Sequence, residues 1–384
     1  MLLISEAPSL FYQCVKSEKI MTTPAIEKVD GLPIFSAIEP DTIKPAVEKA
    51  IAACKSEIEE VVASKDYSYK NLVLRLEEVD DRLSKMFSPV SHMNSVVSSD
   101  ELRDAHDACL PLLSEYGTWV GQHEGLYNAY AELKASDEFE SLSEEQQKVI
   151  ENAVRDFTLS GVALPVEQKK RFAEIQAKLS ELSSTFSNNV MDATMGWTKH
   201  VTDEAELAGM PESALEAAAQ AAHQKDLQGW LFTLDIPSYL PVMLYADNRE
   251  LREEMYRAYS TKASEQGPNA GKWDNTDIIK ETLTLRTELA ELLGFSSYAE
   301  RSLATKMADS TDQVIGFLRD LAAKSKPQAE RELEEVKAYA RDKHGVTELA
   351  AWDLPYYSEK LKQEKYTISD EMLRPYFPED KVLS

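Results

Sequence analysis

Cysteine and glycine are both scarce in this chain. Its three cysteines, Cys14, Cys54 and Cys109, lie far apart and are odd in number. They indicate neither a disulfide framework nor a cysteine metal site, and a reducing compartment such as the cytoplasm is expected. Only 13 glycines occur in 384 residues, and none belongs to a glycine-rich phosphate loop. These absences argue against disulfide-stabilised secreted proteins and against nucleotide-binding enzymes.

Long apolar runs and positive charge are lacking as well. No run of about 18 apolar residues occurs, so a membrane-spanning helix is not expected. Residues 1–4 are apolar, but Glu6 and Pro8 follow at once and no basic residue precedes them, which makes a poor signal peptide. The 42 Lys and Arg against 67 Asp and Glu give a net charge of −25. This charge disfavours nucleic acid and anionic lipid as partners, whereas a neutral or cationic peptide would meet no repulsion.

Hydrolytic motifs are also missing. A zinc peptidase helix needs two histidines four residues apart, with a glutamate after the first. That spacing occurs nowhere among the six histidines, which are His92, His106, His123, His200, His223 and His344. The nearest match is His123-Glu124, where Tyr127 stands in place of the second histidine. No serine nucleophile elbow occurs either, because Ser160-Gly161 lacks the preceding glycine.

The histidines that are present favour structural roles. For His123-Glu124 we expect capping or hydrogen bonding within a helical hairpin. A zinc site assembled from His92, His106 and His123 is the alternative, since these residues fall on helices expected to be neighbours, although nothing in the sequence requires their side chains to converge. We therefore predict no catalytic, cofactor-binding or metal-ligating residue in this chain.

Most of the chain carries apolar residues three or four positions apart, which predicts an all-α fold with at least ten helices. In the first long helix, after residues 39–41, the inner stripe is Ile43, Val47, Ile51, Cys54, Ile58 and Val61. Ser88-Pro89 is expected to end the next helix, and Pro111 to break or kink another. Further helices are predicted over 115–134, from Ser143, and over 169–191, 204–226, 241–259, 276–293, 310–324, 327–344 and 355–365.

Two short aromatic-rich runs interrupt the helical pattern. Residues 197–201 and 230–234 are predicted to be strands, which makes a minor two-stranded β element near residues 197–234. Periodicity does not decide between parallel and antiparallel pairing. We favour a small ribbon packed on helices.

Aromatic and acidic side chains are the remaining candidates for chemistry. Core packing is favoured for the aromatic residues, and a wall that stacks on a peptide substrate is the alternative; they are Tyr239, Tyr245, Tyr256, Tyr259, Trp352, Tyr356 and Tyr357. Carboxylate pairs such as Glu253-Glu254 indicate solvated helix faces. Cys54 is expected in the core.

Several ordered stretches resemble the thimet oligopeptidase family of zinc metallopeptidases. They include Leu-Asp-Ile-Pro-Ser-Tyr at 234–239, Arg-Glu-Leu-Arg-Glu at 249–253, Asn-Ala-Gly-Lys-Trp-Asp-Asn at 269–275, Phe-Ser-Pro-Val-Ser-His at 87–92 and Asp-Ala-Thr-Met-Gly-Trp-Thr-Lys at 192–199. The resemblance runs from about Leu32 to the last residues. It implies an N-terminal helical domain over 32–195 and the start of the peptidase domain over 196–384, with residues 1–20 as an extension outside the family.

The resemblance also implies an activity. Family members have two helical lobes around a narrow channel with a zinc ion, and they hydrolyse short peptides. Their His-Glu-x-x-His helix and later glutamate ligand lie towards the C-terminus, beyond the position of Ser384, so no catalytic or metal residue can be carried onto this chain. We expect part of that channel architecture only, no zinc bound by this chain alone, and no activity from it.

Three interpretations of the missing motif stay open. The favoured one is an N-terminal portion of a zinc metallo-oligopeptidase, truncated before the zinc motif. The alternatives are half of a split enzyme completed in trans by a separately encoded C-terminal half, and a peptide-binding module. Truncation would leave apolar side chains exposed near the end of the chain; they are Tyr366, Ile368, Met372, Leu373, Tyr376 and Phe377.

Overall fold

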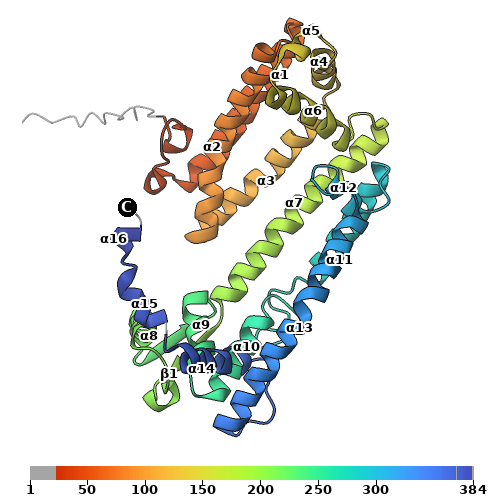
Figure 1. The fold of residues 1–384 in the computed structure, drawn as a ribbon. Helices are drawn as coiled ribbons and strands as arrows, with labels where there is room; N and C mark the ends of the chain where they lie inside the picture. The colour runs from red at the N-terminus through yellow and green to blue at the C-terminus, as the bar shows by residue number, and fades with distance from the viewer. Residues whose placement is uncertain (1–22, 369, 383–384) are drawn as a thin grey trace, which may run out of the picture. The chain divides into compact units, whose positions relative to one another are not determined.

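The computed structural model describes residues 23–368 and 370–382, which are mostly helical. Within them the chain is 73% helical, with one two-stranded sheet (Figure 1). The expected all-α class with a minor β element is therefore confirmed. The chain divides into two compact units, Met1–Val162 and Ala163–Ser384. The extension expected at residues 1–20 lies outside the described residues, and the family boundary expected near residue 195 stays a prediction.

In unit 1, the unit that ends at Val162, the residues that the structure describes are arranged as helices joined by turns. Helix α1 packs against both α2 and α3, and α4 packs against α6. The elements are a 3₁₀ turn at Ala25–Glu27, another at Phe35–Ala37, α1 (Pro40–Ser64), a π-helical turn at Tyr69–Leu74, α2 (Arg75–Val96), α3 (Asp100–Gly121), α4 (Glu124–Lys134), α5 (Asp137–Ser141) and α6 (Glu144–Leu159).

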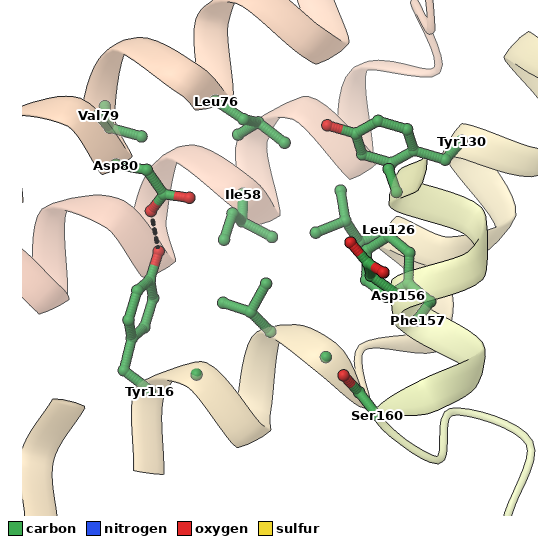
Figure 2. Close-up of a pocket in the computed structure, with 14 residues that line it drawn as sticks. Ile58, Leu76, Val79, Asp80, Tyr116, Leu126, Tyr130, Asp156, Phe157 and Ser160 are labelled. Atoms are coloured by element: carbon green, nitrogen blue, oxygen red, sulfur yellow. Dashed lines mark hydrogen bonds between the residues drawn. The ribbon is translucent and has the colours of Figure 1, made fainter. Parts of the chain in front are cut away.

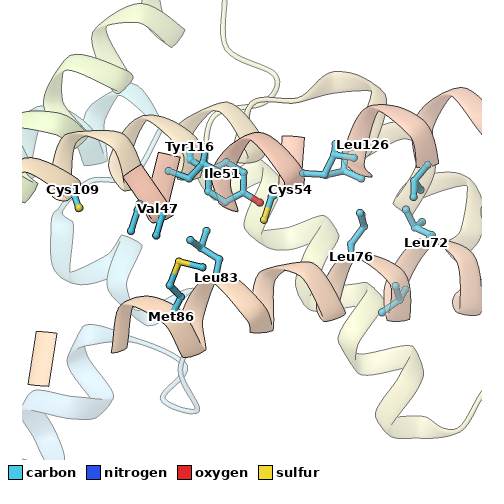
Figure 3. Close-up of a cluster of buried hydrophobic side chains, with 14 of the residues drawn as sticks. Val47, Ile51, Cys54, Leu72, Leu76, Leu83, Met86, Cys109, Tyr116 and Leu126 are labelled. Carbon is cyan, nitrogen blue, oxygen red and sulfur yellow. The ribbon is translucent and has the colours of Figure 1, made fainter. Parts of the chain in front are cut away.

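The predicted apolar stripe of α1 forms the centre of the core of unit 1. All six of its residues are buried, and the side chains of α2 and α3 lie against them (Figure 3). Burying a Val, Leu or Ile side chain contributes about 1.5–3 kcal/mol. Cys54 lies in this core as expected, with its Sγ 3.5 Å from the Val79 carbonyl oxygen. Burial raises the pKa of its thiol, so it is a packing residue rather than a nucleophile.

Prolines do not end the helices as the sequence predicted. Helix α2 continues through Pro89 to Val96, and α3 continues through Pro111 to Gly121. The expected stop at Ser88-Pro89 is therefore wrong, and so is a break at Pro111, whereas the kink that was the alternative at Pro111 stays a prediction. An interior proline costs about 3 kcal/mol through its lost N–H donor and ring clash. Val90 and Tyr116, which are buried just beyond the two prolines, provide the packing that offsets this cost.

Unit 2, from Ala163 onwards, is built along the long helix α7, which packs against α11. At one end of α7 lie the sheet, α8, α9, α10 and α14 (Figure 1). The elements are α7 (Val166–Met195), β1 (Thr198–Val201), a 3₁₀ turn at Glu204–Leu207, α8 (Glu212–His223), β2 (Trp230–Thr233), α9 (Ile236–Tyr245), α10 (Arg249–Ser260), α11 (Thr276–Leu292), α12 (Tyr298–Leu303), α13 (Thr311–His344), α14 (Leu354–Tyr366), α15 (Asp370–Leu373), a 3₁₀ turn at Arg374–Tyr376 and α16 (Glu379–Val382).

The pairing of α7 with α11 combines an apolar seam with an ion pair. Phe172, Ile175 and Leu182 of α7 are buried with Leu285 and Leu289 of α11. Arg171 of α7 forms a bidentate pair with Glu288 of α11, at 2.6 and 2.7 Å. Planar pairing of this kind fixes orientation as well as distance, so α7 and α11 are held in register along their contact.

The two strands form the small ribbon that the sequence favoured, and the structure settles their orientation, which the sequence left open, as antiparallel. Thr198 pairs with Thr233 and Val201 with Trp230, and α8 packs against β2. The turn into β2 requires glycine at 229, because its φ is +90° and a Cβ there would lie 2.4 Å from the Val201 carbonyl oxygen.

Three predicted helices of unit 2 have different boundaries from those expected. The segment predicted as one helix over 241–259 is two helices, because Asn248 caps a new one by accepting hydrogen bonds from the amides of Glu250 and Leu251. Conversely, the helices predicted over 310–324 and 327–344 form the single helix α13. This helix is 34 residues long and continues through Pro327 without a break.

Candidate functional site

The histidines do not converge on a metal site. In the part of the chain that the structure describes, no group of three or more His, Cys, Asp or Glu side chains is placed to hold a metal ion. His92 pairs with the Phe35 ring, and His106 stacks on Phe87 with its Nδ1 2.9 Å from Asp107. The alternative of a zinc site built from His92, His106 and His123 therefore finds no support.

His123 has the structural role that was favoured for it. It is the N-cap of α4, where its Nδ1 accepts a hydrogen bond from the Leu126 amide at 3.0 Å. The proton then lies on Nε2, which is 3.3 Å from a carboxylate oxygen of Glu59 in α1. Both ring nitrogens are engaged, so neither offers a free lone pair to a metal.

The most strongly organised polar site is a buried ion pair in unit 2. Arg252 of α10 and Asp353, just before α14, are 1% and 0% exposed, and Arg252 Nη2 lies 2.9 Å from Asp353 Oδ1. Arg249 adds a second guanidinium, with Nη2 2.6 Å from Asp353 Oδ2. The amide of Ala350 donates a further hydrogen bond to Asp353. Buried charges need full pairing of this kind, because an unpaired one is very costly.

The pKa of Asp353 depends on two opposing effects, burial and hydrogen bonding. Burial alone raises it, but hydrogen bonds from Arg249, the Ala350 amide and Arg252 outweigh burial and hold it below its ordinary value. The carboxylate is therefore ionised at neutral pH. It acts as an anchor for the two arginines rather than as a proton donor.

Arg252 joins three segments of unit 2. Its Nη1 donates to the Ala246 carbonyl at 2.7 Å, its Nε donates to the Trp352 carbonyl at 3.3 Å, and its guanidinium lies 4.1 Å from the Tyr356 ring centroid. The end of α9, the helix α10 and the start of α14 are thus tied to one side chain. The Arg-Glu-Leu-Arg-Glu stretch at 249–253 that carried the family resemblance consequently builds the architecture of unit 2.

The aromatic residues pack largely on one another, as the favoured interpretation predicted. Tyr356 and Tyr357 are buried, and the Tyr356 hydroxyl donates to Asp247 at 2.7 Å. Tyr239 and Tyr259 stack at 4.1 Å between centroids, with the ammonium of Lys262 4.0 Å from the Tyr259 ring. The core-packing interpretation is confirmed for Tyr356 and Tyr357. The partly buried Tyr239–Tyr259 stack retains an accessible edge.

Sequence reasoning missed Asp353. Asp353 was not singled out because its two arginine partners are about a hundred residues earlier in the chain. A single acidic residue beside Trp352 and Pro355 carries no periodic pattern. The sequence did show that Arg249 and Arg252 are three positions apart and therefore lie on one face of a helix. This spacing could have suggested a shared acidic partner.

Apolar side chains are exposed along α13 and near the end of the chain. No residue from 312 to 335 is buried, and Phe317 is 66% exposed, with Ile315, Leu318 and Leu321 also exposed beside it. The six apolar residues expected to be exposed near the end of the chain are all exposed, Tyr376 at 79%. Contiguous exposed apolar side chains are typical of surfaces that another protein segment covers.

Comparison with known proteins finds the same family that the sequence motifs resemble. The family described as neurolysin/thimet oligopeptidase, N-terminal domain, matches residues 47–169, and peptidase family M3 matches residues 242–384. Oligopeptidase A of Haemophilus influenzae is 60% identical over 364 residues, which cover 95% of this chain and 53% of that protein. Oligopeptidase A of Escherichia coli is 59% identical over 365 residues, covering 95% and 54%. Dipeptidyl carboxypeptidase of Escherichia coli is 26% identical over 354 residues, covering 92% and 51%.

The extent of these matches is as informative as their identity. The chain spans about half the length of the curated relatives it matches. In the described part of the chain, no helix combines the length and the apolarity that crossing a lipid bilayer requires.

Proposed function

The chain belongs to peptidase family M3, the thimet oligopeptidase family, and on this premise we propose that it is the N-terminal half of an oligopeptidase A-like enzyme that hydrolyses short peptides in the cytoplasm. The observation that carries the proposal is the 60% identity to oligopeptidase A, which extends over 95% of this chain and half of that protein. Identity this high over so long a stretch supports the same architecture for the corresponding half.

The residues present do not fit the zinc ion that this family uses. The sequence holds no His-Glu-x-x-His spacing, and the one His-Glu pair has both imidazole nitrogens engaged in unit 1. We assign zinc binding and hydrolysis to a polypeptide outside these 384 residues, and we derive no catalytic step here. Alone, the chain is expected to be inactive.

The role of this half is structural support for the catalytic half. In unit 2, Arg252 and Asp353 fix α9, α10 and α14 relative to one another. The exposed face of α13, formed by Ile315, Phe317, Leu318 and Leu321, and the apolar side chains near residue 376 provide surface for a further helical part to cover. A stand-alone peptide-binding module has no need of such surface, so we favour the half-enzyme.

Reconstitution tests the proposal. The purified chain is mixed with the separately expressed C-terminal half of Escherichia coli oligopeptidase A, zinc and an internally quenched peptide. We expect turnover that a chelator abolishes from the mixture, and none from this chain alone. Chelator-sensitive turnover by this chain alone would contradict the assignment. A mixture without turnover, together with saturable peptide binding by this chain alone, would establish the binding module instead.

A further inference from the structure

Unit 1 contains a cavity that no part of the proposed function uses. Its volume is about 330 Å³, at the small end of the roughly 300–1,000 Å³ typical of ligand pockets. Side chains from α1, α2, α3, α4 and α6 line it (Figure 2), and its apolar wall includes Ile58, Leu76, Val79, Val120, Leu126 and Phe157.

The charged side chains that line the cavity are both acidic, and its other polar side chains carry neutral hydroxyls. Asp80, Asp156, Tyr116, Tyr130 and Ser160 contribute oxygen atoms to its lining, and no Lys, Arg or His is among the residues that line it. The sequence carries a net charge of −25 as well. An anion would be repelled from such a cavity, whereas a cation would find acceptors.

Asp80 is the acceptor best placed for a cation. One of its oxygens accepts a hydrogen bond from the Tyr116 hydroxyl at 2.7 Å, which orients the carboxylate (Figure 2). Within the described residues, Asp80 has no ion-pair partner, while Asp156 pairs with Arg155 at 2.8 Å. Burial, together with the negative charges of Glu77 and Asp80, raises the pKa of Tyr130, so its hydroxyl stays neutral beside them.

A helix-interior glycine stands at the edge of the cavity. Gly117 lies within α3, where glycine costs about 1 kcal/mol relative to alanine. A Cβ at this position would meet no atom within 4 Å, and its φ is not in the left-handed region. Neither packing nor backbone conformation therefore requires glycine here. Its absent side chain leaves the lining of the cavity open.

We propose that this cavity binds a small amphipathic cation, a molecule with a compact apolar body and one primary ammonium group. The body lies against Ile58, Leu76 and Phe157, and the ammonium donates to Asp80. A free arylalkyl amine and the N-terminal residue of a peptide share this chemistry. The inference does not depend on the proposed peptidase role, because the cavity is complete within unit 1.

Isothermal titration of the 384-residue chain tests the proposal, with phenethylamine as the probe. We expect saturable binding at least tenfold tighter than that of 2-phenylethanol, which has the same body without the charge, and no binding of 3-phenylpropionate. Phenylalanyl-alanine amide with a free or an acetylated N-terminus separates the two sources: binding of the free form alone adds peptide N-termini to the ligand class, and binding of neither limits it to free amines. Absence of phenethylamine binding, or equal affinity for the alcohol, would overturn the proposal.

Two variants and one control variant locate the bound ligand. Gly117→Leu fills the edge of the cavity and is expected to weaken phenethylamine binding at least tenfold, whereas Gly316→Leu, at an open helical glycine of α13, leaves it unchanged. Asp80→Asn is expected to abolish the preference for the amine over the alcohol. Unaltered amine binding by Gly117→Leu, in a variant whose thermal midpoint shows that it folds, would show that the ligand lies elsewhere and refute the assignment.

Discussion

Arg252 and Asp353 form a fully buried ion pair, 2.9 Å from Nη2 to Oδ1, between α10 and the segment that begins α14. We expect Asp353→Ala to destabilise the chain by about 3–5 kcal/mol, because it leaves Arg252 charged, buried and without its carboxylate partner. The measurement is the free energy of unfolding from urea titration. Arg249→Ala is the matched control, since the Arg249 side chain is 54% exposed and its loss keeps the inner pair intact; it should cost much less. Equal losses from both variants would refute a central role for Arg252.

The same pair predicts a pH dependence of stability. Because the pKa of Asp353 is lower in the folded chain than in the unfolded chain, its contribution is fully present above the unfolded value of about 3.9. That contribution is lost as the pH falls below this value towards the folded pKa. We therefore expect the difference in unfolding free energy between the wild type and Asp353→Asn to be constant from pH 6 to pH 5 and to shrink below pH 4. A difference that grew on acidification would contradict the ionised assignment.

Gly229 allows the turn before β2 to lie close against the end of β1. Gly229→Ala places a Cβ 2.4 Å from the Val201 carbonyl oxygen at a φ of +90°, and we expect it to destabilise unit 2 by about 2 kcal/mol or more. Gly117→Ala is the comparison, because it meets open space in a helix and should stabilise unit 1 by up to about 1 kcal/mol. Thermal unfolding of the two variants measures both effects, and a neutral Gly229→Ala would show that the turn can rearrange.

The exposed face of α13 is expected to matter only when the catalytic half is added. Phe317→Asp and Leu321→Asp change side chains that are 66% and 51% exposed, so the helical content of the isolated chain should not change. In the reconstitution assay each should lower zinc-dependent turnover at least tenfold. Ala323→Asp serves as the control, because it introduces the same charge on the same helix about 120° away from Phe317 and about 160° away from Leu321. Turnover lost equally in all three variants would indicate a general effect of charge rather than an interface.

Local sequence patterns correctly predicted features that depend on residues close together in the chain, such as the apolar face of α1 and the cap of α4. The α1 stripe from Ile43 to Val61 is buried as expected, because an apolar face that runs along about five turns of helix is stabilised only by packing against neighbouring helices. The capping role of His123 could be predicted because it depends on neighbouring residues. Pro89 and Pro111 were misread because the local cost of a proline is outweighed by packing with distant residues, which single-sequence patterns do not record.

The polar centre of unit 2 and the cavity of unit 1 could not be predicted from the sequence. Asp353 meets Arg252 across about a hundred residues, and the cavity exists only where side chains of five helices fail to fill the space between them. Both are properties of long-range packing. The missing His-Glu-x-x-His spacing, in contrast, was visible at once, because that motif is defined by spacing within a single helix.

The lack of burial along residues 312–335 of α13 has a consequence for hydrogen exchange. Helical hydrogen bonds alone stabilise an isolated helix only marginally in water, so the amides of this stretch should open by local fluctuations far more readily than those of α1. Their exchange should slow sharply once a partner covers Phe317 and its neighbours. Deuterium uptake by α13 would therefore report whether a partner has bound to this chain, without any enzymatic assay.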